Sequence, residues 1–102
     1  MMNRKMLKQA QELQKQMLQV QQEVESSSVE ATSGGGVVTV RVTGKMTLES
    51  LKISKDVVDP EAVEMLEDLV QAAINEGLSK AQQMASEKMN AVTGGMNIPG
   101  LS

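Results

Sequence analysis

The chain has 102 residues and a formal net charge of −3 at pH 7, and this length allows one domain. It contains no Cys and no His, which excludes disulfides, Cys–His zinc sites and His-dependent nucleophilic catalysis, so we expect no enzyme, no metal or other cofactor and no small-molecule substrate. Phe, Tyr and Trp are also absent, which removes the stacking platforms that RNA and single-strand readers use.

The first expected helix is "RKMLKQAQELQKQMLQVQQEV", residues 4–24. Asn3 is its expected N-cap, and the helix should run to about Glu25, a length of roughly 34 Å. Its apolar residues are spaced four and three apart, which predicts a narrow seam that packs on another helix. The seam consists of Met6, Ala10, Leu13, Met17, Val20 and Val24.

Three short strands are expected next, over residues 29–32, 37–42 and 48–54. The clearest is "VVTVRV", in which Val38, Val40 and Val42 share one face of a β-branched segment. In the third strand, Leu51 and Ile53 are expected on the buried face. Glycine-rich segments at residues 34–36 and 44–45 predict the turns that connect the strands.

The second expected helix begins with Asp59 as N-cap and Pro60 at the first helical position, and it continues to about Val92. Carboxylates near this start are interpreted as capping groups that interact favourably with the positive end of the helix dipole, not as ligands for a metal. Residues 93–102 carry Gly and Pro without any apolar period, so we expect a domain over 1–92 and a flexible tail over 93–102. The apolar stripe of this helix is Val63, Leu66, Val70, Ile74, Gly77, Ala81 and Met84.

The element order is therefore α-β-β-β-α, an α+β fold with two long terminal helices. Strands of six residues span only about 20 Å, so part of each helix must project beyond the sheet as an arm. We expect the two helices to pack on each other. A small core without aromatic residues buries little surface, and this predicts that a second copy of the chain supplies the missing burial as a homodimer.

The four basic residues of the first helix, Arg4, Lys5, Lys8 and Lys15, lie on the face opposite the seam. This face is either an ordinary solvated helix surface or a surface that follows DNA phosphates, and the pattern alone leaves both open. The stretch from Arg41 to Lys55 is also basic. No apolar run approaches the 20 or so residues that span a bilayer and no secretory pattern opens the chain, so we expect a soluble cytoplasmic protein without membrane contact.

Three segments together resemble the YbaB/EbfC family of bacterial nucleoid-associated proteins. They are "KQAQELQKQM" (8–17), "EMLEDLVQAAIN" (64–75) and "TGGMNIPGL" (93–101), and the second is the most specific. The resemblance implies an α-β-β-β-α fold with a three-stranded antiparallel sheet and a tweezer-like homodimer joined through its sheet regions. It also implies binding of duplex DNA with little sequence preference, in nucleoid organisation or gene regulation, and a location at the nucleoid.

The same resemblance places the arms at residues 3–25 and in the distal half of the second helix. The expected DNA-binding residues on these arms are Arg4, Lys5, Lys8, Lys15, Lys80 and Lys88. The alternative function is a protein-interaction module whose helical arms grip a replication or recombination factor.

Overall fold

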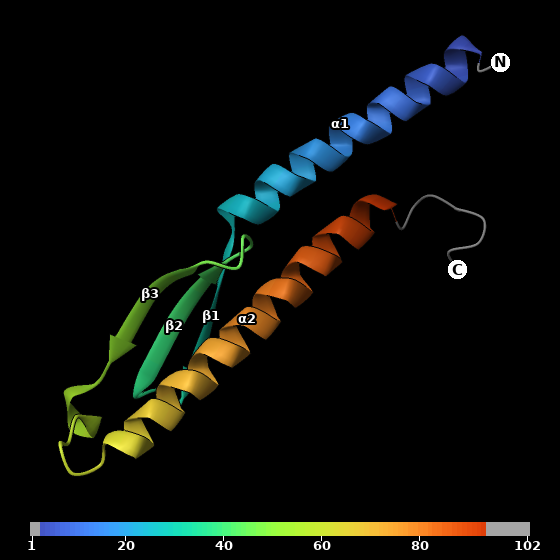
Figure 1. The fold of residues 1–102 in the computed structure, drawn as a ribbon. Coiled ribbons are helices and arrows are strands. Elements are labelled where there is room, and N and C mark those ends of the chain that lie inside the picture. Colours follow the sequence, from blue (N-terminus) through green and yellow to red (C-terminus); the bar gives the residue numbers. More distant parts are fainter. Residues whose placement is uncertain (1–2, 94–102) are drawn as a thin grey trace.

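The computed structural model describes residues 3–93 and has the order α-β-β-β-α, which confirms the expected fold class (Figure 1). The molecule is elongated, with extents of 70 × 25 × 18 Å. A short 3-10 helix, η1, precedes the last element and was not expected from the sequence. The elements are α1 (Arg4–Ser26), β1 (Ser28–Ser33), β2 (Val38–Thr43), β3 (Leu48–Ile53), η1 (Lys55–Val57) and α2 (Val63–Thr93).

Helix α1 begins where its capping residue predicts. The side chain of Asn3 accepts a hydrogen bond from the backbone N–H of Met6 at 2.8 Å, which satisfies one of the free donors at the helix start. At the other end, the hydroxyl of Ser27 donates to the carbonyl oxygen of Glu23 at 2.6 Å. The helix ends at Ser26, one residue beyond the expected position.

The three strands form one antiparallel sheet in the order β1-β2-β3. Val40 in the central strand pairs with Ala31 of β1 and with Leu51 of β3, so these side chains share the inner face. Val38, Val40 and Val42 are fully buried on that face, as their alternation predicts. The expected glycine turn joins β1 to β2, with positive φ at all three glycines.

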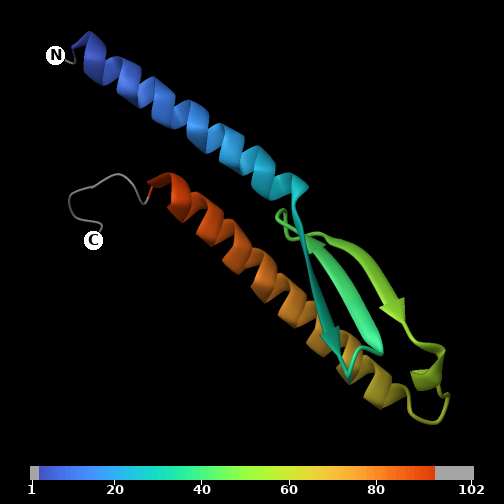
Figure 2. The ribbon, with the colours of Figure 1, turned by 180° about the vertical axis from the view of Figure 1, so that it is seen from behind.

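Helix α2 packs across the inner face of β1 and β2 (Figure 2). The hydroxyl of Ser33 in β1 donates to the carbonyl oxygen of Leu69 in α2 at 2.5 Å. At the centre of this contact, a Cβ on Gly77 would lie 2.8 Å from Val42 Cγ2 and 3.0 Å from Val40 Cγ2. Glycine therefore permits the close approach of the helix to the sheet, because any side chain there would require Val40 and Val42 to shift.

The start of α2 differs from the expectation. The helix begins at Val63, three residues after the expected first position at Pro60. Asp59 instead caps a separate turn, in which its side chain accepts from the N–H of Glu61 at 2.9 Å and its carbonyl accepts from Ala62. Asp59 therefore does cap a turn through its side chain, but this turn ends before α2 begins.

Helices α1 and α2 run antiparallel and meet beside the sheet, which confirms the expected packing of the two terminal helices (Figure 1). Val24 is buried at this junction, and Lys88 Nζ forms an ion pair with Glu23 Oε1 at 3.0 Å. Only the part of the seam near the sheet is covered in this way. Because α2 ends five residues after Lys88, at Thr93, α1 continues past the end of α2.

Candidate nucleic-acid interface

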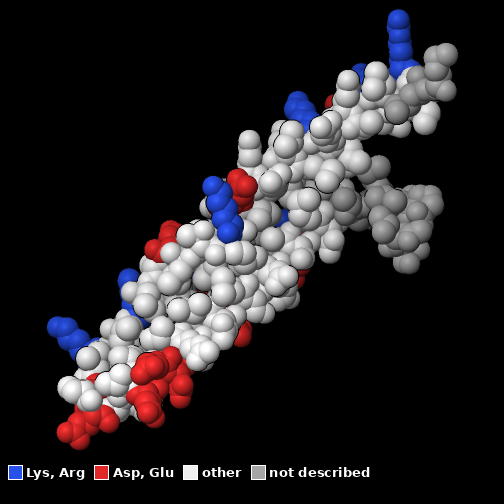
Figure 3. All heavy atoms as spheres, viewed as in Figure 1, with Lys and Arg blue, Asp and Glu red and all other residues white. Residues whose placement is uncertain are grey.

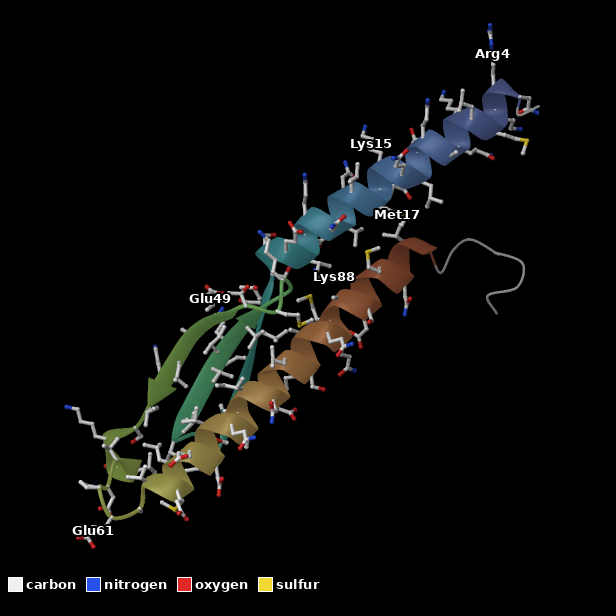
Figure 4. The ribbon with its side chains drawn as sticks, in the orientation of Figure 1. Arg4, Lys15, Met17, Glu49, Glu61 and Lys88 are labelled. Carbon is white, nitrogen blue, oxygen red and sulfur yellow. The ribbon has the colours of Figure 1, made fainter. Side chains whose placement is uncertain are left out.

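The four basic residues predicted on the first helix share one exposed face of α1. Figure 4 shows Arg4 and Lys15 pointing away from α2, whereas Met17 points toward it. This separation follows from the helical period, because residues that alternate four and three apart occupy one side and leave the other to solvent. The structure thus brings together Arg4, Lys5, Lys8 and Lys15.

These basic side chains carry charge that no described residue neutralises through an ion pair. The two ion pairs within residues 3–93 involve Arg41 and Lys88 instead. One carboxylate, Glu12, lies beside Lys5 and Lys8 along a shallow hollow of α1, and it lowers the local positive charge by one. The face keeps a net excess of three positive charges, which favours an anionic partner.

Lys80 and Lys88, the other two predicted residues, lie elsewhere. Lys80 Nζ donates to the backbone carbonyl of Glu30 in β1 at 3.1 Å, at the side of the sheet. Lys88 lies between the helices, with its side chain 32% exposed. The spacing on α2 could not reveal these partners, because β1 and α1 approach it from distant parts of the chain.

The densest group of acidic residues lies at the opposite end of the molecule, where segment 56–68 holds six of the thirteen Asp and Glu residues. Figure 3 shows a cluster of Asp and Glu atoms around the start of α2, while Lys and Arg atoms occur at intervals along α1. The segment from Asp56 to Asp68 supplies these carboxylates. The charge is therefore segregated along the long axis, with the arm at the more positive end.

A second surface was not anticipated from the sequence: an open apolar groove between β3 and the first half of α2. Leu51 and Ile53 face inward as expected, but they are 41% and 37% exposed, so the expectation that they are buried is wrong for the single chain. Helix α2 covers β1 and β2 and leaves β3 uncovered, since one helix is narrower than three strands. The hollow has a volume of about 540 Å³, and its apolar lining is Leu51, Ile53, Val63, Leu66, Val70 and Ile74.

Neither long helix, within the part of the chain that the structure describes, is apolar enough to cross a membrane. Among the same residues, no group of three carboxylate side chains converges to hold a metal ion.

Residues 1–96 match the profile of the family described as the YbaB/EbfC DNA-binding family, which confirms the resemblance inferred from the sequence. The chain is 53% identical to a nucleoid-associated protein of Alkaliphilus metalliredigens (strain QYMF), over 94% of this chain and 84% of the relative. It is 50% identical to a nucleoid-associated protein of Clostridium acetobutylicum, over 94% of this chain and 86% of that one.

The fold is also found in a solved structure. The crystal structure of the uncharacterized protein HP0035 from Helicobacter pylori superposes with a TM-score of 0.68, covering 85% of this chain and 92% of that one. The two sequences are 22% identical, so this likeness concerns the fold alone.

Proposed function

Because the chain belongs to the YbaB/EbfC DNA-binding family, we propose that it binds duplex DNA through backbone phosphates, with little preference for sequence. Its relatives are named nucleoid-associated proteins, and the proposal places this chain likewise at the nucleoid in the cytoplasm, in organisation of the chromosome or regulation of genes. Catalysis is not part of the proposal, because the matching family is described as DNA-binding and the sequence has neither Cys nor His.

The observation that carries the proposal is the exposed basic face of α1. Arg4, Lys5, Lys8 and Lys15 stand on one side of a straight helix that projects beyond the sheet. Long, flexible Arg and Lys side chains on such a surface contact phosphates, and phosphates carry no sequence information. These side chains do not reach base edges in a fixed geometry. Lys80 and Lys88 would add to this surface only where the duplex also meets α2.

We further propose that a second copy of the chain covers the groove between β3 and α2, which gives a homodimer. An exposed apolar patch of this kind marks an interaction surface, and β3 in addition has an unpaired strand edge. The groove lies at the end of the molecule away from the tip of α1, so dimerisation leaves both arms free. Two-fold symmetry then doubles the number of phosphate contacts.

Sedimentation tests the dimer with one substitution and one control. Leu51→Lys places a charge in the groove and should give a folded protein of single-chain mass at low micromolar concentration. Leu18→Lys makes the same change on the arm, where Leu18 is 56% exposed, and should leave the dimer intact. A parent protein that sediments as a well-folded monomer contradicts the dimer.

The DNA proposal is tested by reversing charge on the arm. Lys5→Glu combined with Lys8→Glu should abolish measurable binding and change stability by no more than about 0.5 kcal/mol per site, because both positions are exposed. For the parent, about four to six phosphate contacts per dimer predict a log–log salt slope of roughly −4 to −5. Electrophoretic shift titrations at several salt concentrations, on unrelated duplexes, measure both quantities.

The matched control is Lys45→Glu combined with Lys55→Glu, which makes the same charge change at the turn between β2 and β3 and at η1, both exposed. This variant should bind almost as the parent does. If it loses binding while the arm variant retains it, the basic stretch from Arg41 to Lys55 is the DNA-facing surface and the assignment to α1 is wrong. Binding that does not weaken with salt would favour the protein-interaction module instead.

A further inference from the structure

The free half of α1, Arg4–Met17, has an apolar seam that faces no helix among residues 3–93. Lys88 pairs with Glu23, and in an antiparallel pair the last residue of α2, Thr93, then lies opposite about Leu18. The exposed fractions of the seam agree: Val24 is 7% exposed, Met17 37% and Met6 54%. Where a heptad seam continues past the end of its partner helix, its apolar spacing still fits the packing of a second helix.

The residues that flank this seam are uncharged. On the two sides of Met6, Ala10, Leu13 and Met17 stand only Leu and Gln at the positions that decide which helix can pair with which. Arg4 and Lys15 point to the far side of α1, whereas Lys5 and Lys8 line a hollow beside Leu13 together with Glu12, which offsets one of their charges. Two copies of this surface can therefore face each other without repulsion between like charges. The flanking residues are Leu7, Gln9, Gln14 and Gln16.

We propose that the free half of α1 pairs, antiparallel, with the same segment of a second copy of this chain. The proposal goes beyond DNA binding and does not depend on it. In the register that places Met6 opposite the partner copy's Met17, the small Ala10 lies opposite the larger Leu13, so the side chains interdigitate. The sheets then lie at opposite ends of the pair, and the basic faces remain outside it.

The pairing joins separate molecules at their arm tips, whereas the proposed groove dimer joins them at the sheets. Each free half contains about two heptads, so the contact is short and weak, and its population rises with protein concentration. Molecules held along one duplex are concentrated locally, which favours the contact there. Each dimer has two such surfaces, one on each arm, so successive dimers can join into a row.

The absence of Cys from the chain permits a clean crosslinking test. Met6→Cys and Met17→Cys are purified separately in the full chain, and they are oxidised mildly, alone and mixed. In the antiparallel register the mixture should form a disulfide at least about tenfold faster than either variant alone, because like positions lie about 16 Å apart along the axis. The control mixture of Met6→Cys with Leu18→Cys should crosslink slowly, although Leu18 is more exposed than Met17.

The rate in the first mixture should rise with protein concentration. A rate independent of concentration would mean that the arms of one dimer meet each other, and equal rates in both mixtures would reflect random collision; either result overturns the proposal. So would a rapid disulfide within one chain between Ala10→Cys and Ile98→Cys, since residues 94–102 would then occupy the seam.

Sedimentation gives a second, non-covalent measurement. The average mass of the parent should rise above that of the dimer from low to high micromolar concentration. Ala10→Glu, which keeps a good helix former, should remove this rise and leave the low-concentration mass unchanged. A parent mass that stays constant over that range contradicts the pairing. Both measurements are made without DNA, so failure of the DNA proposal would not affect them.

Discussion

Around Gly77 the inner face of the central strand is fully buried, whereas along Arg4–Met17 the helix exposes much of its apolar seam. Val38, Val40 and Val42 have no exposed surface, while Met6 is 54% exposed. Both regions carry a regular apolar period in the sequence. An apolar period thus indicates whether a face packs on a helix or on a sheet, but the fold decides whether the same chain provides that partner.

The largest expected effect is a difference in unfolding free energy between a substitution in the buried sheet face and one in the exposed seam. Val40→Ala removes two buried methyl groups and should lower the free energy of unfolding by about 2–3 kcal/mol. Met6→Ala removes more atoms but should change it by no more than about 0.5 kcal/mol, because the site is half exposed. Denaturant unfolding at one protein concentration measures both. Similar losses for the two variants would show that the seam of α1 contributes as much to folding as the inner face of the sheet does.

A smaller effect is expected at the tightest contact of the body. Gly77→Ala gains about 1 kcal/mol of helix propensity, but its Cβ collides with Val40 and Val42, and such overpacking costs about 1–3 kcal/mol. The net result should be a loss of about 1 kcal/mol in unfolding free energy. Ala72→Gly, at an exposed position of α2, calibrates the propensity alone. Stabilisation by Gly77→Ala would show that the valines move aside freely.

The smallest effect is expected beyond the arm. We propose that residues 93–102 contribute little to folding, so truncation after Val92 should shift the melting temperature by less than about 3 °C, equivalent to under about half a kcal/mol. Thermal unfolding of the parent and the truncated chain at equal concentration measures it. A large decrease would instead place Met96, Ile98 and Leu101 against the body.

Local patterns predicted most of the fold. The cap at Asn3 and the alternation from Val38 to Val42 act over a few residues, so they can be read directly from the chain. The start of α2 was missed because Asp59 caps equally well a turn that ends before the helix. Leu51 and Ile53 were assigned to the correct face, but their burial depends on how far one helix reaches across three strands.

In the candidate site too, local spacing predicted some positions, while others depend on distant parts of the chain. The shared face of Arg4, Lys5, Lys8 and Lys15 follows from helical geometry and was predicted. The positions of Lys80 and Lys88 depend on partners in β1 and α1 that lie 50 and 65 residues away in the chain, and no spacing on α2 could reveal them.

If the arm binds duplex DNA as proposed, the length of α1 limits how it can follow the duplex. Its 23 residues extend about 34 Å, close to one full turn of B-DNA. From Arg4 to Lys15 the helix advances about 16 Å, or roughly five base pairs, and over that distance the backbone winds half way around the duplex. A straight arm parallel to the duplex axis therefore cannot keep both residues on one strand. It must either cross a groove and contact both strands or lie obliquely, so a longer helix would add reach but few phosphates.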